Sequence, residues 1–165
     1  SLTTNWTIVF NSTLDTCMQD ECYPNYSARE RMLAFVFTLL QYLKEDETHF
    51  LPIILNQKFP FLTNKDMIEL KEHFYKYSDV LIFDATNTGE IQARPIIANY
   101  YQQTIWNALL AILYFWANDK SEYKENTDVM VEKTIHFTFD LLAPNPIDSG
   151  IDLVRHFLKL RIPNL

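Results

Sequence analysis

The feature that most constrains this chain is a segment that is apolar on every side of a helix. From Ala108 onward, the segment 104–117 (TIWNALLAILYFWA) carries apolar side chains in three helical rows. The rows are Leu109, Ile112 and Trp116; Leu110, Leu113 and Ala117; and Ala111 with Phe115. Because a surface helix has one apolar stripe and one polar face, this helix must be covered on more than one side. We expect the chain's own core to cover one side and a second molecule to cover another.

The segment that follows, 126–143, also reads as a helix with two apolar rows, and Asn126 or Thr127 is expected to cap it. Two such helices side by side suggest half of an intermolecular four-helix bundle. The sequence therefore predicts a homodimer. The expected interface residues are Leu110, Leu113, Ala117, Val131, Ile135 and Thr138.

Composition favours one all-α domain over residues 1–165. The chain is 48% hydrophobic and 21% charged, which is typical of a globular protein, and it contains only two glycines. Tight hairpins and phosphate-binding loops need glycine, so strand-rich folds and nucleotide-binding loops are disfavoured. The periodicity of apolar residues predicts an antiparallel bundle of about seven helices. These span residues 4–20, 27–46, 48–57, 65–85, 95–118, 126–143 and 148–161.

Local signals predict where several of these helices begin, end or bend. Ser27 and Glu30 have the spacing of a capping box. Pro52 lies inside a helical pattern and predicts a kink or a broken start, whereas Pro95 is expected near the first turn of its helix. Gly89 is the expected left-handed residue after the long helix 65–85.

Charge and cysteine usage narrow the possible partners and compartments. The net charge of −7 disfavours nucleic-acid binding by this chain, since phosphate contacts need clustered Lys and Arg. Polar residues interrupt each long apolar run, so no membrane helix is expected. We expect a cytoplasmic protein in which Cys17 and Cys22 are reduced thiols, with a disulfide left open as the alternative. The chain begins without Met and reads as a fragment of a longer protein.

No enzyme is predicted, because no nucleophile elbow and no metal signature of the HExxH or CxxC type occurs. No catalytic residue, metal site or cofactor is therefore assigned. Two acid–histidine pairs lie four residues apart on predicted helices, Glu69 with His73 and His136 with Asp140. Each pair could hold a metal or relay a proton, but ordinary helix-surface contacts are the favoured interpretation.

Four phrases, taken in order, resemble the C-terminal part of TetR-family transcriptional regulators. They are NWTIVFNSTLD (5–15), YSARERMLAFVFTLLQYLK (26–44), TGEIQARP (88–95) and LYFWANDKSEYKENTDVMVEKTIHFTFDLLAPNPIDSGIDLVRHFL (113–158). The resemblance covers essentially all of the chain. It implies that these helices bind an effector and dimerise. It also implies that a separate N-terminal helix-turn-helix module, which this chain lacks, reads DNA.

The resemblance leads us to expect an apolar or aromatic small-molecule effector. Binding pockets for such molecules are mostly apolar, with a few polar groups that fix orientation. We expect a cavity of several hundred Å³, where the long helix passes from the monomer core toward the dimer seam. Its candidate lining residues are Phe35, Leu39, His73, Phe74, Tyr77, Tyr100, Gln103 and Trp106.

Two functions from different classes remain open at this point. The chain is either the effector-sensing and dimerisation domain of a regulator, expected to be a repressor, or a free-standing lipid or isoprenoid carrier with the same architecture. A helix-turn-helix pattern encoded upstream of Ser1 would favour the regulator.

Overall fold

The computed structural model describes residues 6–57, 64–95 and 97–145, together with positions 148, 150, 153–156 and 158. Over these residues the chain is all-α, as predicted, with six α-helices, three short 3₁₀ helices and no strand. The predicted helix 148–161 lies only partly within the described residues, and its C-terminal end lies outside them. The elements are α1 (Trp6–Met18), η1 (Tyr23–Asn25), α2 (Ala28–Glu45), α3 (Glu47–Leu55), η2 (Lys65–Met67), α4 (Ile68–Thr88), α5 (Asn99–Asn118), η3 (Glu122–Lys124) and α6 (Glu125–Leu142).

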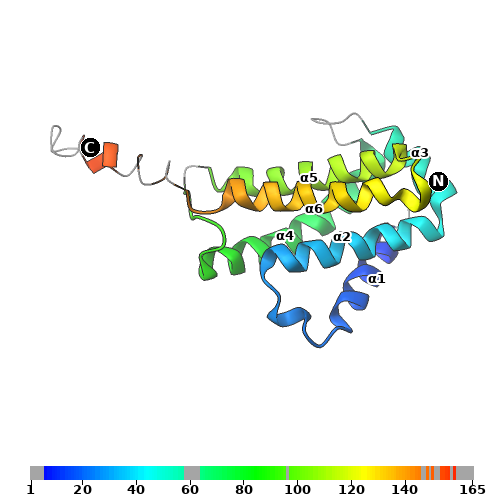
Figure 1. Ribbon diagram of the computed structural model, residues 1–165, viewed down its shortest axis with the longest axis horizontal. Helices are drawn as coiled ribbons and strands as arrows, with labels where there is room; N and C mark the ends of the chain where they lie inside the picture. The colour runs from blue at the N-terminus through cyan, green and yellow to red at the C-terminus, as the bar shows by residue number, and fades with distance from the viewer. Residues whose placement is uncertain are drawn as a thin grey trace.

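The long helices lie in two adjoining pairs (Figure 1). Helices α5 and α6 run side by side and antiparallel, joined by a short turn, while α2 packs on α6 and α4 packs on α5. Helix α1 lies outside α2 and α4 and contacts both of them. Among the described helices, none has the length and apolar character needed to cross a membrane.

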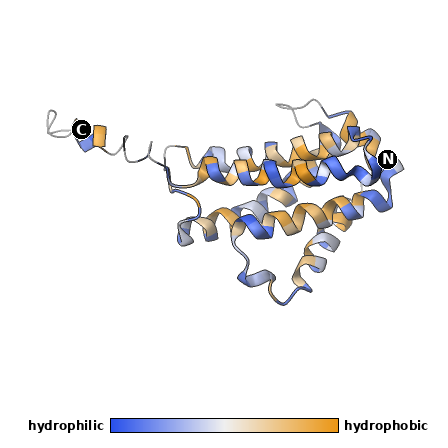
Figure 2. Cartoon of the chain, in the orientation of Figure 1, coloured by the Kyte–Doolittle hydropathy of each residue, from blue (hydrophilic) through white to orange (hydrophobic). Residues whose placement is uncertain are grey.

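The long helices carry both apolar and polar residues, and Figure 2 shows the two kinds alternating along the ribbons. The core contains residues from all six α-helices, and large aromatic side chains fill much of it. Trp6, Phe35, Phe74, Trp106 and Phe139 are among its largest fully buried side chains. A densely packed interior of this kind leaves little empty space between helices.

Two of the predicted helix ends are confirmed. The Ser27 side chain accepts a hydrogen bond from the Glu30 backbone N–H at 3.2 Å, and the Glu30 carboxylate accepts one from the Ser27 backbone N–H at 2.8 Å. These two bonds form the capping box. Gly89 follows α4 with φ of 79°, a left-handed conformation that glycine adopts without a Cβ clash. Pro52 lies within α3, and the kink or broken start expected there stays a prediction.

The start of α5 differs from the prediction. The helix begins at Asn99 rather than near Pro95, because the preceding segment pairs with the end of α6 instead of coiling. The Gln92 backbone N–H donates to the Leu142 carbonyl at 2.8 Å. The Arg94 guanidinium then donates to the Leu142 carbonyl and, at 3.0 Å, to the Ala143 carbonyl.

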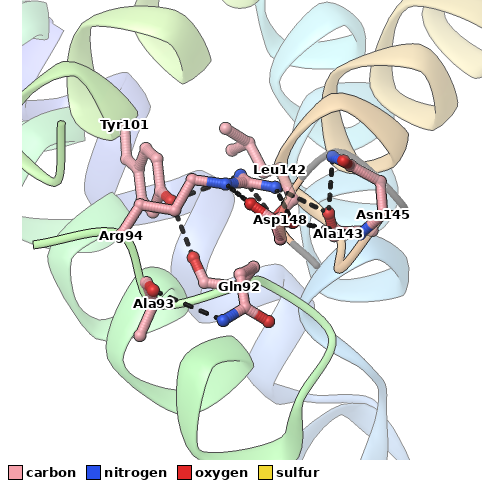
Figure 3. A network of polar contacts seen from close by, with 8 residues as sticks. All are labelled: Gln92, Ala93, Arg94, Tyr101, Leu142, Ala143, Asn145 and Asp148. Atoms are coloured by element: carbon pink, nitrogen blue, oxygen red, sulfur yellow. Dashed lines mark hydrogen bonds and ion pairs between the residues drawn. The ribbon is translucent and has the colours of Figure 1, made fainter. Parts of the chain in front are cut away.

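Arg94 lies at the centre of a polar network (Figure 3). Its Nε and one terminal nitrogen each donate to the Asp148 carboxylate at 2.7 Å, which makes the ion pair bidentate. Hydrogen bonding from this guanidinium lowers the pKa of Asp148, and the carboxylate in turn raises the pKa of Arg94. The Tyr101 hydroxyl, which also accepts a long bond from Arg94, donates to the Gln92 carbonyl at 2.6 Å. The network therefore holds the end of α6 against the start of α5.

The start of α6 also differs from the prediction, because neither Asn126 nor Thr127 is its N-cap. The Asp119 carboxylate instead accepts from the Thr127 backbone N–H at 2.9 Å and from the Thr127 hydroxyl at 2.7 Å. Between them, Tyr123 and Lys124 both adopt positive φ, which places the turn in an uncommon conformation. The turn is thus held by a carboxylate at the end of α5 rather than by a residue of α6.

Candidate functional site

Four of the eight candidate ligand residues lie in a packed aromatic core. Phe35, Leu39, Phe74 and Trp106 are fully buried. The ring of Phe74 lies 5.9 Å from that of Phe35 and 5.8 Å from that of Trp106, measured between centroids. These distances are typical of aromatic side chains in direct contact. None of the four lines either of the two openings described next.

The first opening, which we call the α1–α4 cleft, has a volume of about 430 Å³. Two of the candidate residues, His73 and Tyr77, line it. Its floor is mostly buried and apolar, whereas Met18 and Val80 at its edges are 60% and 57% exposed. The remaining lining residues are Phe10, Leu14, Tyr23, Arg31, Lys76 and Leu81.

A chain of hydroxyl groups closes one wall of the α1–α4 cleft. The Tyr77 hydroxyl donates its hydrogen to the Arg31 carbonyl at 3.2 Å. The Tyr23 hydroxyl lies 3.0 Å from it, and because the Tyr77 hydrogen is already used, Tyr23 is the donor of this second bond. Burial raises the pKa of Tyr77 well above its ordinary value, and it also raises the pKa of Tyr23. Both phenols therefore stay neutral at physiological pH and add no negative charge to the cleft.

Helix α1 is attached to α4 by polar contacts beside the cleft. The Thr7 hydroxyl lies 2.9 Å from His73 Nε2 and donates to the Glu69 carboxylate. The Trp6 indole N–H donates to the Asp66 carbonyl at 2.8 Å. The acid–histidine pair of α4 therefore holds a side chain of the neighbouring helix.

The second acid–histidine pair is engaged in a similar way. Arg29 of α2 donates to the Asp140 carboxylate at 2.7 Å and lies 3.1 Å from His136 Nδ1. Within the part of the chain that the structure describes, no group of three His, Cys, Asp or Glu side chains could hold a metal ion. Cys17, which is buried, and Cys22, which is exposed, are both free thiols in this structure.

The second opening, the α4–α5 groove, is larger, at about 900 Å³. Gln103, a candidate residue, lines it and accepts a hydrogen bond from the Tyr75 hydroxyl at 2.8 Å. Its other lining residues are mostly polar, with side chains of both charges next to one another. They are Ile68, Lys71, Glu72, Lys76, Asp79, Gln102 and Asn107.

The eighth candidate, Tyr100, lies away from both openings. It is 66% exposed at the N-terminal end of α5, whereas its neighbour Tyr101 is buried. The helical rotation of about 100° per residue explains this difference, since only one of two successive residues can face the core. The structure thus does not bring the eight candidates together around one cavity.

Five of the six candidate interface residues are buried inside the chain's own core, and Ala117 is half-buried. Leu110, for example, is 2% exposed. The first two apolar rows of α5 are turned toward the other helices of the same chain. The five buried residues therefore offer almost no surface to a second copy.

The third row of α5 is turned outward instead, together with one side of α6. We call this surface the outer α5–α6 face. Phe137 on it is 64% exposed and Leu141 is 51% exposed. Helical spacing places these positions beside the seam between the two helices, on the side away from α2 and α4. The face consists of Tyr100, Thr104, Ala111, Phe115, Met130, Thr134, Phe137 and Leu141.

Comparison with known protein families identifies the family to which this all-α chain belongs. A family model described as the tetracycline repressor-like C-terminal domain matches residues 31–158. The chain therefore belongs to this family, as the sequence phrases indicated. No curated protein and no solved structure matches the chain. The match begins within α2, so α1 and its half of the α1–α4 cleft precede the matched region.

Sequence reasoning missed Arg31, Lys76 and Val80 as lining residues of the cleft. A signal for two of them was present, because His73, Lys76, Tyr77 and Val80 follow one another at helical spacing on α4. The position of α1 across that side of α4 depends on packing between distant segments, and no local pattern in α1 indicated it.

Proposed function

We propose that this chain is the effector-sensing and dimerisation domain of a cytoplasmic DNA-binding transcription regulator that acts as a repressor. The family membership supports a ligand-binding and dimerisation role. We assign DNA binding to a helix-turn-helix module outside these 165 residues, since the net charge of −7 disfavours phosphate contacts by this segment.

The observation that carries this proposal is the outer α5–α6 face. Large apolar side chains such as Phe115, Phe137 and Leu141 lie at the surface on two adjacent antiparallel helices. Contiguous exposed apolar surface on a folded chain marks an interaction site. Packing against the same face of a second copy would form a four-helix bundle with twofold symmetry.

We further propose that an apolar small molecule binds in the α1–α4 cleft. Small-molecule sites are typically clefts of about 300–1,000 Å³ with apolar walls and a few polar groups, and the cleft fits this description. His73 and Tyr77 of the candidate set would contact the ligand. The α4–α5 groove is larger, but its polar walls carry both charges and suit water better than an apolar ligand.

The cleft also supplies a route from ligand to DNA. Helix α1 covers one side of the cleft and is held to α4 through Thr7 and Trp6 near its first turn. A ligand that binds one placement of α1 better than another would shift the population of the two placements. A preceding DNA-reading module attached to α1 would move with it.

The test is the oligomeric state in sedimentation velocity at micromolar concentration. Wild-type protein is expected to sediment as a dimer, and Phe137→Glu as a folded monomer, because the new charges would be desolvated in the seam. Val129→Glu is the matched control, since Val129 is an exposed apolar residue of α6 that lies on a different side of the helix. A monomeric wild type that still binds apolar ligands would favour the carrier alternative instead.

A further inference from the structure

We propose that the ligand of the α1–α4 cleft is an apolar molecule bearing one acidic group, such as a medium-chain carboxylate, and that Arg31 and Lys76 recognise the acidic group. This inference rests on the proposed small-molecule role and specifies the chemical class. It is carried by the composition of the cleft, which differs in charge from the rest of the chain.

The charge lining the cleft is positive. The chain as a whole has 21 acidic and 14 basic residues, yet the cleft is lined by Arg31 and Lys76 and by no carboxylate. The phenols of Tyr23 and Tyr77 remain neutral, as argued above. An acidic group placed in the cleft would meet two cations and no opposing negative charge from its lining.

Both cations have capacity for a further partner. Lys76 is exposed and forms no ion pair with any of the described residues. Arg31 pairs with Asp84 at 3.0 Å through one terminal nitrogen, while its Nε is buried without a hydrogen-bond partner. A buried donor without a partner costs free energy, so a ligand oxygen that reached it would be favoured.

The rest of the cleft fits an apolar body. Phe10 and Leu81 form part of a buried floor, and Met18 and Val80 leave apolar surface exposed at the edges. Covering those edges would remove apolar area from water, which favours binding in proportion to the area buried. The Tyr77 hydroxyl and His73 Nε2 already have partners within the chain, so Arg31 and Lys76 are the charged groups left for a ligand.

The charge preference is tested by calorimetric titration of the 165-residue chain with three probes of equal chain length. The two ionic probes are kept below their micelle concentrations, and the neutral one is kept below its solubility limit. The probes are decanoate, decan-1-ol and decyltrimethylammonium. Decanoate is expected to bind about tenfold more tightly than decan-1-ol, since hydrogen bonds to charged groups contribute that much. Decyltrimethylammonium is expected to bind more weakly than either. Equal affinity for decanoate and decan-1-ol would overturn the acidic class.

Variants locate the site. Lys76→Glu is expected to weaken decanoate binding at least tenfold and to leave decan-1-ol binding unchanged. Its control is Lys71→Glu, on the same helix but outside the cleft, which should change the binding of neither probe.

Arg31→Gln is also expected to weaken decanoate binding. Its control is Asp84→Asn, which breaks the same ion pair but keeps the guanidinium, so decanoate binding should be retained or strengthened. Leu14→Trp fills the cleft and is expected to abolish the binding of both decanoate and decan-1-ol. Full decanoate binding by Lys76→Glu and Arg31→Gln, with folding confirmed by circular dichroism, would overturn the proposal.

The outcomes for the ligand class and for the proposed function are separable. A dimeric chain that binds decan-1-ol as well as decanoate overturns the acidic class and leaves the sensing and dimerisation role standing. A chain that is monomeric and binds none of the probes overturns both.

Discussion

Two apolar surfaces of this chain lie open, and they differ in shape and charge. The α1–α4 cleft is a concave opening of about 430 Å³, lined by two cations and no carboxylate. The outer α5–α6 face extends along two long antiparallel helices, with exposed side chains such as Phe137 and Leu141. Small molecules bury most of their surface in concave sites, whereas protein partners need broad complementary surfaces. The same apolar chemistry thus suits a ligand at one place and a second copy at the other.

The aromatic core separates the two surfaces. Phe35, Phe74 and Trp106 are packed against one another between the cleft and α5. Packed cores shift between discrete arrangements rather than deforming smoothly. A ligand in the cleft would therefore act on the proposed dimer through whole helices. Substitutions at one surface should leave the other intact unless they disturb the core.

The largest expected effect comes from adjacent residues of α5 that face opposite ways. Leu110→Glu places a charge in the core and is expected to destabilise the chain by about 4 kcal/mol or more, enough to unfold it. Ala111→Glu is expected to leave the monomer folded but to prevent dimer formation, because Ala111 lies on the outer α5–α6 face. Thermal melts and sedimentation separate the two results. A folded, monomeric Leu110→Glu variant would restore the interface that the sequence alone suggested.

This pair also illustrates what the sequence could predict. The apolar residues on every side of α5 indicated that more than one of its sides is covered. The capping signals at Ser27 and Gly89 predicted the start of α2 and the end of α4 correctly. Periodicity could not tell which apolar row of α5 faces the chain's own helices, because Leu110 and Ala111 are equally apolar in a pattern. That choice depends on how α4 and α6 pack on α5, which involves residues far apart in the sequence.

The candidate ligand residues show the same limit. His73 and Tyr77 do line an opening, but Phe35 and Trp106, chosen for the same aromatic character, fill the core. Whether an aromatic side chain lines a cavity or closes it depends on the volume of its neighbours, which a single sequence does not contain. The turn at Asp119 was missed because a carboxylate eight residues before Thr127 lies outside the local spacing of capping motifs.

Arg94→Gln tests the end of the outer face farthest from the α5–α6 turn. The change removes a bidentate ion pair with Asp148 and two bonds to the carbonyls that end α6. The side chains of the pair are 17% and 18% exposed, so we expect the free energy of unfolding to fall by more than it would for a fully exposed ion pair. Denaturant melts measure it. Dimer affinity should fall while decan-1-ol binding in the cleft persists. Arg29→Gln serves as the control, because it removes an Arg–Asp ion pair outside this network.

Thr7→Val tests the other side of the comparison. It keeps the shape of the side chain but removes the hydroxyl that contacts His73 and Glu69, so α1 is held less firmly against α4. We expect a loss of about 1 kcal/mol in stability, altered affinity for probes in the cleft and unchanged dimerisation. Thr86→Val is the control, because the Thr86 hydroxyl bonds only within α4. Unchanged probe affinity would show that α1 does not control the cleft.

The last expected effect concerns acid and the turn that holds α6 against α5. Partial desolvation raises the pKa of Asp119, but hydrogen bonds from Ser121 and Thr127 outweigh it and lower the value from 3.8 to about 2. A carboxyl group with a lowered pKa in the folded state contributes stability that is fully present above its ordinary value and is lost as pH falls. The wild type should therefore lose stability between about pH 4 and pH 2 more steeply than Asp119→Asn, which has no carboxylate to protonate. Other carboxyl groups titrate in the same range, so the difference between the two melting curves isolates Asp119.

The dimer gives a second measurement. If the outer α5–α6 face depends on this turn, the wild-type dimer should also dissociate between about pH 4 and pH 2. The Thr7 contact that holds α1 should be unaffected by Asp119→Asn. Parallel melting curves across the interval would show that Asp119 does not hold the turn through its charge.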